Sequence, residues 1–316
     1  MIENSYSIEL DPLDISPYRQ GNTGIDYITT IDSGQPGPHV MINAIVHGNE
    51  LCGVVALDFL FRNKIVPTRG KLTLSFANTA AYLTFDPENP NDSRFVDEDF
   101  NRVWDIDKLE GVIDSTERNR AREMRPIVDQ VDYLLDLHSL MHDTPALLLS
   151  GALRKGKDLA FRLKTPEYVI KDYGHSAGRR LRDYGHFADT ECSENSLLVE
   201  CGQHWKKSTG QTAIETSLGF LHLLQMLAPE LAAQHLTPRQ YPQQKFIEIT
   251  EAVTIQTTSF QFVKEFEGME IFSDAGTLIA TEGDLKILTP YDNCILIMPS
   301  KRISPGLTAV RFGRIS

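Results

Sequence analysis

An apolar run leads into a polar turn at Asn43-Ala44-Ile45-Val46-His47-Gly48-Asn49-Glu50, and a helix-like segment at residues 51–60 follows at once. This order is typical of a strand that delivers side chains into the turn before a helix. His47 and Glu50 occupy the turn, and an imidazole nitrogen and a carboxylate oxygen are both suitable zinc ligands. A His-x-x-Glu pair alone is a weak signal, because a surface turn with a capping carboxylate explains it equally well.

A third ligand has to come from elsewhere in the chain, because a catalytic zinc site uses three protein ligands and keeps one position for water. The best candidate is His138, which closes a second apolar run at residues 131–137. His142 is the substitute if His138 fails. The turn and the second run therefore predict a metal site of His47, Glu50 and His138, supplied by two strand ends.

The segments around this turn predict an α/β domain, in which active sites gather at the carboxyl ends of strands. The ligand positions fit that rule. A strand at the edge of the sheet is expected at residues 25–31. Further strands are expected at residues 70–78, 131–138, 145–149 and 196–202, and helices at 51–60, near 155–163 and at 211–227.

Two charged stretches lie between these elements. Residues 86–105 form a polar loop, whose acidic residues 97–99 are interpreted as a solvated turn rather than a hard-cation site. Residues 115–125 predict a charged helix that begins at a Ser or Thr cap. Its arginines are expected to face solvent.

A change of pattern marks the last part of the chain. Residues 232–244 hold two prolines and polar residues, as expected of a linker. Short strands follow, which predict a small all-β domain. The expected organisation is therefore a catalytic domain at residues 1–235 and a C-terminal β domain at residues 236–316. The expected strands are at residues 246–249, 253–255, 260–263, 277–280 and 294–299.

Composition excludes several classes of protein. The 316 residues are 41% hydrophobic and 23% charged, as expected of a globular protein with one large and one smaller domain. The formal net charge of -12 argues against a nucleic-acid partner. Four cysteines without a C-x-x-C spacing indicate neither a thiolate zinc site nor a disulfide framework.

The sequence also bears on where the protein is located and on its oligomeric state. No apolar run approaches the roughly 20 residues needed to cross a bilayer, so no membrane partner is expected. The first residues lack the basic and apolar regions of a signal peptide, and a cytoplasmic location is the expectation. The sequence leaves a homo-oligomer open.

Four motifs follow one another along the chain. They are His47-Gly48-Asn49-Glu50, Arg94-Phe95-Val96-Asp97-Glu98-Asp99-Phe100-Asn101-Arg102, Asp136-Leu137-His138-Ser139 and Val199-Glu200-Cys201-Gly202-Gln203. In this order they resemble the aspartoacylase/succinylglutamate desuccinylase family, a branch of the zinc carboxypeptidase superfamily, and the resemblance runs from about residue 39 to the end of the chain. It implies a mixed sheet of zinc-carboxypeptidase type flanked by helices, a C-terminal β domain that closes over part of the active site, and one Zn²⁺ per chain.

The resemblance also implies roles for single residues. Glu200 matches the general acid/base, and its place at the end of an apolar strand would raise its pKa toward the working range. Arg94 matches the arginine that stabilises charge on the attacked carbonyl oxygen. Asn101 and Arg102 match the pair that grips a substrate carboxylate. The alternatives are a buried salt-bridged glutamate for Glu200, and loop capping or surface ion pairing for the others.

Two further questions stay open in the sequence. Asp136 lies two residues before His138 and points to the same side of a strand, where it could orient the histidine or cap a neighbouring loop. The extra cation that aspartoacylases use for an acidic side chain has no clear match. Arg179, Arg180 and Arg182, in a loop interpreted as lining the substrate entrance, are the candidates.

The function that these residues predict is a zinc amidohydrolase that cleaves the N-acyl bond of a small acylated amino acid. Succinylglutamate, an acetylated amino acid and acetylated diaminobutyrate would each suit a carboxylate-gripping pair. One alternative is a metallocarboxypeptidase that acts on short peptides. The other is a catalytically silent zinc-containing protein that binds an acidic metabolite.

Overall fold

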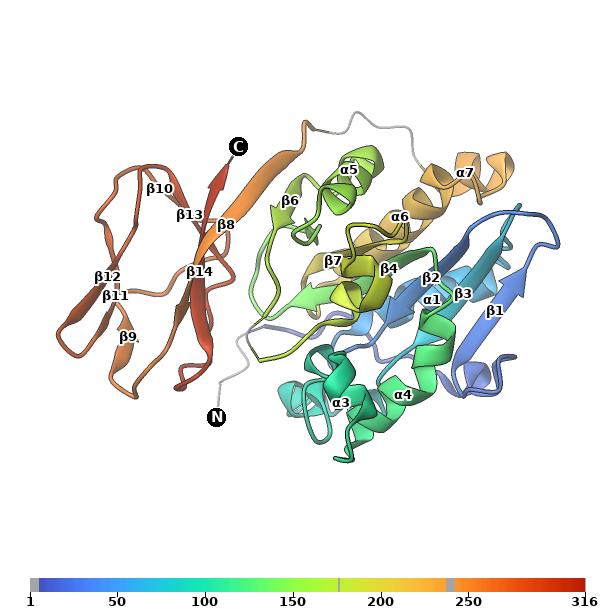
Figure 1. Ribbon diagram of the computed structural model, residues 1–316, viewed down its shortest axis with the longest axis horizontal. Coiled ribbons are helices and arrows are strands. Elements are labelled where there is room, and N and C mark those ends of the chain that lie inside the picture. The colour runs from blue at the N-terminus through green and yellow to red at the C-terminus, as the bar shows by residue number, and fades with distance from the viewer. Residues whose placement is uncertain (1–5, 176, 237–241, 316) are drawn as a thin grey trace.

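The computed structural model describes residues 6–175, 177–236 and 242–315. An 11-stranded mixed sheet runs through this part of the chain, and a three-stranded antiparallel sheet lies at the end formed by the C-terminal strands (Figure 1). Helices flank the large sheet. The predicted fold class, a mixed sheet with helices followed by a small β region, is confirmed.

The elements have the following bounds. The strands are β1 (Ile28–Asp32), β2 (His39–Ala44), β3 (Lys71–Phe76), β4 (Tyr133–Leu140), β5 (Leu147–Leu149), β6 (Tyr168–Lys171), β7 (Asn195–Gln203), β8 (Lys245–Thr254), β9 (Phe260–Phe262), β10 (Ile271–Phe272), β11 (Leu278–Glu282), β12 (Leu285–Leu288), β13 (Cys294–Ile297) and β14 (Thr308–Ile315). The α-helices are α1 (Leu51–Arg62), α2 (Thr79–Tyr82), α3 (Ile106–Glu110), α4 (Thr116–Val128), α5 (Arg154–Leu163), α6 (Lys207–Leu223) and α7 (Pro229–His235). Short 3-10 helices lie at Ser16–Tyr18, Pro90–Arg94, Phe100–Arg102, Leu181–Asp183 and Gly185–Ala188.

The order of strands in the large sheet is β1-β3-β2-β4-β7-β5-β6-β8-β14-β13-β10. Strands β3, β2, β4 and β7 run parallel, and β1 joins the edge antiparallel to β3, in keeping with the expected edge strand. Because β2, β4 and β7 are parallel neighbours, their carboxyl ends lie at the same edge of the sheet. Side chains that follow β2 can therefore meet side chains from the ends of β4 and β7.

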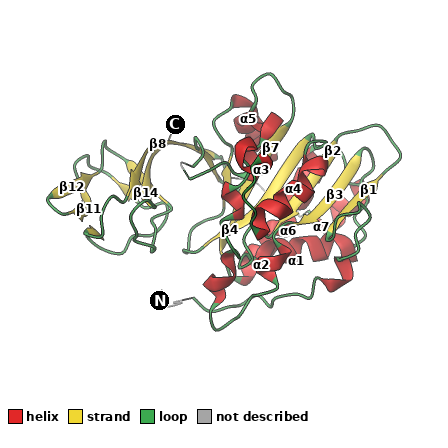
Figure 2. Ribbon diagram, turned by 60° about the horizontal axis from the view of Figure 1, so that its bottom comes forward, coloured by secondary structure: helices red, strands yellow, loops and turns green. Residues whose placement is uncertain are grey.

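Both faces of the sheet are covered, which explains why its strands are continuous apolar runs. Val40 and Ile42 of β2 belong to the core that contains residues of α1, α5 and α6. Met41, between them, belongs to the core that contains residues of α3 and α4. Helices α1 and α6 therefore lie on one side of the sheet and α4 on the other (Figure 2).

The C-terminal strands continue the large sheet. Strand β8 pairs parallel with β6, and β14, β13 and β10 extend the sheet further. Strands β9, β11 and β12 form the smaller sheet, and Phe260, Ile279 and Leu296 lie in a separate core there. The backbone hydrogen bonds of the large sheet thus join strands that come before residue 236 to strands that come after it. The division into domains at residues 1–235 and 236–316 stays a prediction.

The predicted linker at residues 232–244 begins inside a helix, because α7 extends to His235. Residues 237–241 of this linker lie outside the described residues. The two strands expected at residues 246–249 and 253–255 are one strand, β8. Strand β14 was not predicted, because Arg311 and Gly313 interrupt its apolar pattern.

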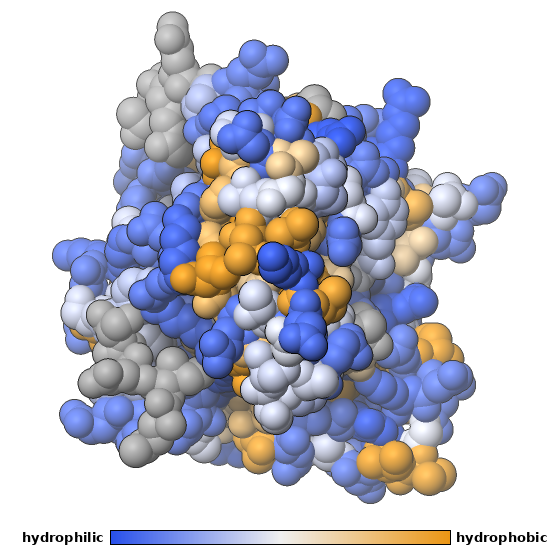
Figure 3. Space-filling view, turned by 90° about the vertical axis from the view of Figure 1, so that its left-hand side faces the viewer, coloured by the Kyte–Doolittle hydropathy of each residue, from blue (hydrophilic) through white to orange (hydrophobic). Residues whose placement is uncertain are grey.

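The end of the molecule formed by the C-terminal strands shows apolar surface divided by hydrophilic side chains (Figure 3). Exposed apolar residues of this region include Ile271 in β10 and Leu285 in β12. In the described ranges, no helix has the length and apolar character that would let it span a membrane.

The arginines of α4 were expected to face solvent, and this is wrong for Arg120 and Arg122. Arg122 donates hydrogen bonds to the carbonyl oxygens of Leu109 and Gly111 at the end of α3. Arg120 donates to the carbonyl oxygen of Ala77. Carbonyl groups at the ends of helices and strands lack partners within their element, so a guanidinium with five N–H groups can satisfy several of them.

Gly53 is a point of close approach between α1 and β2, because a Cβ there would lie 2.7 Å from the Cβ of Ala44. We expect Gly53→Ala to lower the free energy of unfolding by roughly 1–3 kcal/mol through overpacking, although alanine favours helices. At Gly219 in α6 a Cβ would lie 3.6 Å from Leu163, an ordinary contact. Gly219→Ala is the matched control and should be neutral or stabilising by up to about 1 kcal/mol. Denaturant titration measures both, and equal losses would contradict the close approach.

Candidate metal site

The turn after β2 is entered through a strained residue. Ile45 has a φ of +52°, which is rare for a β-branched side chain and costs roughly 1–3 kcal/mol. Its side chain is buried and its carbonyl oxygen accepts the N–H of Asn78 at 2.9 Å, so the surroundings hold this conformation. The N–H of Glu50 then donates to the carbonyl oxygen of His47 at 3.2 Å, and Glu50 occupies the N-cap position of α1 without a capping bond from its side chain. Both side chains consequently face the carboxyl edge of the sheet.

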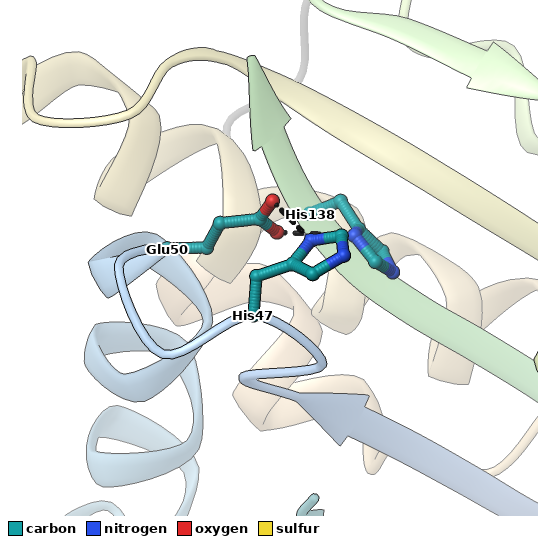
Figure 4. Close-up of side chains that lie close together, drawn as sticks. All are labelled: His47, Glu50 and His138. Atoms are coloured by element: carbon teal, nitrogen blue, oxygen red, sulfur yellow. Dashed lines mark hydrogen bonds and ion pairs between the residues drawn. The ribbon is translucent and has the colours of Figure 1, made fainter. Parts of the chain in front are cut away.

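The three predicted ligands converge at this edge. The carboxylate of Glu50 lies against the rings of His47 and His138 (Figure 4). His47 Nδ1 is 2.7 Å from Glu50 Oε1, and His138 Nδ1 is 3.0 Å from Glu50 Oε2. Their ligand atoms all lie within 4.8 Å of one another, and all three residues are buried. The structure therefore places in one group three side chains that come from two separate parts of the chain.

The contacts of His138 fit a bound cation. Its Nε2 is 3.0 Å from Asp136 Oδ2, and an ionised carboxylate only accepts hydrogen bonds, so Nε2 carries the proton. In a neutral ring the lone pair then lies at Nδ1, which faces an oxygen of Glu50. A cation between these two electron-rich atoms would satisfy both. Asp136 also accepts a hydrogen bond from Asn43 Nδ2 at 2.8 Å. Of the two roles left open for Asp136, contact with His138 is the one observed.

The electrostatics of the group also favour a positive charge beside the carboxylate. Although burial opposes the charged ring, Asp136 and Glu50 raise the pKa of His138 well above its ordinary value. Although burial would raise it, His47 and His138 hold the pKa of Glu50 well below its usual range. The donor set and its charges therefore fit a divalent cation with one position left for water.

Asp99 and Arg94 meet at the outer nitrogen of His47. Asp99 Oδ1 lies 3.1 Å from His47 Nε2, Arg94 Nη2 lies 2.8 Å from the same atom, and Arg94 Nη2 is 3.1 Å from Asp99 Oδ2. The Nε2–H of His47 can donate a hydrogen bond to Asp99, which leaves the lone pair of Nδ1 free to bind a metal. In that tautomer Nε2 cannot also accept from Arg94, so Arg94 acts on the ring through its hydrogen bond to Asp99. Although burial opposes its charge, Asp99 and Glu50 raise the pKa of Arg94.

The interpretation of residues 97–99 as a solvated acidic turn is wrong for Asp99. For Asp97 and Glu98 it is incomplete, because both carboxylates also have partners in the protein. The carboxylate of Asp97 accepts the N–H of Thr116, and Glu98 pairs with Arg118. The loop folds back on the site, which local charge does not reveal. The one available signal was that Asp99 lies between Arg94 and Asn101 in a single motif.

Glu200 stands directly beside His138, because the two residues are partners in the register of β4 and β7. Burial raises the pKa of Glu200 to about 8, with His138 opposing the shift and Glu50 adding to it. Its Oε2 has no hydrogen-bond partner among the described residues. A nearby cation would lower this pKa again. Glu200 is thus a buried carboxyl group that can gain or lose a proton near neutral pH.

Asn101 and Arg102 lie at the same loop. Asn101 is buried, and its Oδ1 accepts the N–H of Leu181 at 3.2 Å. Arg102 donates to the carbonyl oxygen of Asn101 at 2.7 Å, and no carboxylate of the described ranges forms an ion pair with it. Burial lowers the pKa of Arg102 to about 10, Asp99 opposes this, and Arg180 and Arg311 add to it. Positive charge is therefore in excess around Arg102.

The arginines proposed from the sequence as an extra substrate cation are mostly engaged. Arg180 is buried in ion pairs with Asp172 and Asp183, and Arg182 also pairs with Asp183. Arg311 of β14 approaches the same region, since it interacts with both Asp172 and Arg180. Sequence reasoning missed Arg311, because nothing in the last strand signals that it reaches this part of the sheet.

A cavity of about 520 Å³ lies beside this cluster. Residues of the loop that was expected to line a substrate entrance contribute to its wall, among them His175 and Arg179. Lys108 also lines it, but His47, Glu50 and His138 do not. The cavity therefore adjoins Arg102 rather than the candidate metal ligands, since Lys108 donates to the carbonyl oxygen of Arg102.

Comparison with protein families gives one match. The model of the succinylglutamate desuccinylase/aspartoacylase catalytic domain matches residues 36–227, which is more than half of the chain. This stretch contains every residue that was predicted to act at the site, namely His47, Glu50, Arg94, Asn101, Arg102, His138 and Glu200. A comparison with curated proteins found no match.

Several solved structures share the fold. A succinylglutamate desuccinylase from Vibrio cholerae has a TM-score of 0.68 at 15% identity, with 92% of this chain and 86% of that chain covered. A succinylglutamate desuccinylase/aspartoacylase from Rhodobacter sphaeroides has a TM-score of 0.64 at 14% identity, with 92% and 88% covered. The ectoine utilization protein EutE from Ruegeria pomeroyi, in a product-bound structure, has a TM-score of 0.62 at 14% identity, with 93% and 92% covered. The shared fold therefore extends beyond residues 36–227 into the C-terminal strands.

The site predicts one strongly bound divalent cation per chain. After chelator treatment and dialysis against Zn²⁺, metal analysis should find about one equivalent in the wild-type protein and close to none in His138→Ala. His142→Ala is the matched control, since this histidine lies four residues later and outside the ligand group. Full metal content in His138→Ala would show that the three side chains do not form the site.

Proposed function

We propose that this chain, which belongs to the succinylglutamate desuccinylase/aspartoacylase family, is a zinc hydrolase that cleaves the amide bond of a small N-acylated amino acid. The products are a carboxylate and a free amine. The observation that carries the proposal is the group of His47, Glu50 and His138 with Glu200 as the next residue across the sheet. Ligands and a proton-transfer group within one buried site are the requirements of metal-assisted amide hydrolysis.

The ligand set favours zinc. Two imidazoles and one carboxylate with a fourth position for water are typical of catalytic zinc. When bound, zinc lowers the pKa of a water molecule and polarises the substrate carbonyl. The imidazole ligands would be Nδ1 of His47 and Nδ1 of His138, because these atoms face the carboxylate of Glu50 while Asp136 holds the other nitrogen of His138.

Glu200 is the proposed general base and acid. It takes the proton of the attacking water and returns it to the amine nitrogen as the carbon–nitrogen bond breaks. Transfer in both directions is efficient when the pKa of the group lies near the working pH, and burial moves the pKa of Glu200 in that direction. Its Oε2, which has no hydrogen-bond partner in the described part of the chain, is one oxygen available for the proton.

Arg94 is the proposed stabiliser of the developing oxyanion. Its guanidinium is held by Asp99 and lies within 2.8 Å of His47, so it stands at the edge of the metal site. A donor fixed in place before the reaction stabilises negative charge without the cost of reorganising solvent.

Asn101 and Arg102 are proposed to bind the carboxylate of the substrate. The excess of positive charge around Arg102, to which Arg311 contributes from β14, supports an anionic ligand. A carboxylate would accept two parallel hydrogen bonds from a guanidinium. This favours an N-acyl amino acid over a neutral amide.

Direct assay of a substrate panel tests the proposed function. Succinylglutamate, acetylated amino acids and acetylated diaminobutyrate each carry the required carboxylate, and short peptides belong in the same panel. Zinc-dependent release of succinate or acetate is expected from at least one of the acylated compounds. Cleavage of C-terminal residues from peptides without deacylation would instead identify a carboxypeptidase.

Substitution of Glu200 tests the proton transfer. Glu200→Gln keeps the shape of the side chain but cannot exchange a proton, and kcat should fall about 10²–10⁴-fold. Bound zinc should stay at about one equivalent, because Glu200 is not a proposed ligand. Glu191→Gln, in the exposed turn before β7, is the control and should retain full activity. Near-wild-type kcat in Glu200→Gln would eliminate this residue as the base.

Substitution of Arg102 tests the carboxylate site. Arg102→Leu removes charge-assisted hydrogen bonds worth about 1.5–3 kcal/mol, so kcat/KM should fall about 10–150-fold. The fall should be much smaller for a substrate analogue whose carboxylate is replaced by an amide. Arg62→Leu, at an exposed position in α1, is the control. An equal loss for the acid and the amide substrate would refute carboxylate recognition by Arg102.

A further inference from the structure

Glu117 is a buried carboxylate that the proposed reaction does not use. It lies in the first turn of α4, a charged helix, and yet its side chain has no exposure to solvent. Burial of a carboxylate is costly unless hydrogen bonds replace the lost water. The donors around Glu117 therefore explain how it can be buried.

Four N–H donors surround this carboxylate. Oε1 accepts from Asn78 Nδ2 at 3.0 Å and from the backbone of Val96 at 2.7 Å. Oε2 accepts from the backbones of Asp97 at 3.0 Å and Glu98 at 3.1 Å. Three consecutive backbone amides of the loop thus point at a single side chain, in the manner of an anion-binding nest. The path of the loop at residues 96–98 is fixed by this contact.

The residues on either side of this held segment reach the metal site. Arg94 precedes it and Asp99 follows it, and both contact Nε2 of His47. A continuous series of contacts therefore runs from Glu117, through the backbone of residues 96–98, to the outer nitrogen of a candidate metal ligand.

A second set of contacts holds the loop against the metal turn. The N–H of Gly48 donates to the carbonyl oxygen of Arg94 at 3.1 Å. A Cβ at Gly48 would lie 2.3 Å from the carbonyl oxygen of Ser93, so the two backbones are in close approach. The loop is thus bound to the turn on one side and to α4 on the other. Displacement of residues 96–98 would be transmitted directly to His47.

We propose that Glu117 is a positioning residue of the metal site, which fixes the loop at residues 96–98 so that Asp99, paired with Arg94, holds His47 in its ligand orientation. Glu117 itself touches neither the ligand atoms nor the proposed substrate site. The effect on metal affinity follows from the contacts alone, whereas the effect on turnover rests on the proposed function.

Glu117→Gln tests this role without a change of shape. The amide replaces one acceptor oxygen with an NH₂ group that faces two N–H donors, so part of the loop loses its anchor. Amide hydrogen exchange should become faster in the peptide that contains Val96, Asp97 and Glu98. Chelator competition should show a zinc affinity about 10-fold lower or more, because outer partners of metal-binding histidines typically have such effects.

Glu123→Gln is the matched control, because Glu123 lies on the same helix, is exposed and pairs with Arg120. It should change neither exchange in the loop nor zinc affinity. If Glu117→Gln does not fold, Asn78→Ala removes one of the four donors from Glu117 and should show smaller changes of the same kind. Unchanged loop exchange and unchanged zinc affinity in a folded variant at Glu117 would overturn the proposed role.

Turnover gives a separate test, in a double-mutant cycle with Arg94→Ala. If Glu117 acts through this loop, Glu117→Gln should lower kcat about 10–100-fold with a smaller change in KM, and add little further loss in the Arg94→Ala background. Fully additive losses would show that Glu117 supports stability only. If the wild-type protein hydrolyses none of the panel, the proposed function fails, and the exchange and zinc measurements still decide the role of Glu117.

Discussion

A carboxylate buried between two imidazole rings is the interaction on which this structure depends. Such a group is stable only when each of its partners is fixed by further hydrogen bonds. Asp136 holds His138, and Asp99, paired with Arg94, holds His47. Each of these outer residues is held in turn, so that the geometry at Glu50 is the result of several shells of contacts.

Parallel strand register supplies most of this arrangement. Asn43 of β2 is the partner of Asp136 in β4, and His138 of β4 is the partner of Glu200 in β7. Two successive rows on one face of the sheet therefore carry the orienting carboxylate of Asp136 and, beside each other, the ligand His138 and the proposed base Glu200. The strain at Ile45 completes the arrangement, because the chain must turn sharply after β2 to direct His47 toward these residues.

Much of the fold and the site was predictable from the sequence, because the apolar runs before His47 and His138 are covered on both faces and so read clearly as strands. The three residues predicted as ligands lie together in the structure, and their role as metal ligands stays a prediction. The role of Asp99 was not predictable, because an acidic residue in a polar loop looks the same whether the loop faces water or folds back on a site. Glu117 could not be recognised either, because three of its four partners are backbone amides, which the sequence does not distinguish. Strand β6 is only four residues long, too short for its periodicity to be recognised.

Strand β14 lies between β8 and β13 although the chain contains both of those strands before it. On the ribosome, β8 can dock against β6 as soon as it emerges, but its other edge stays open until β14 has been made. A nascent chain could therefore assemble His47, Glu50 and His138 while Arg311 is still to be synthesised. Assembly of the candidate metal ligands and completion of the proposed anion site would then be separate events in the biogenesis of the protein, with one edge of β8 unpaired between them.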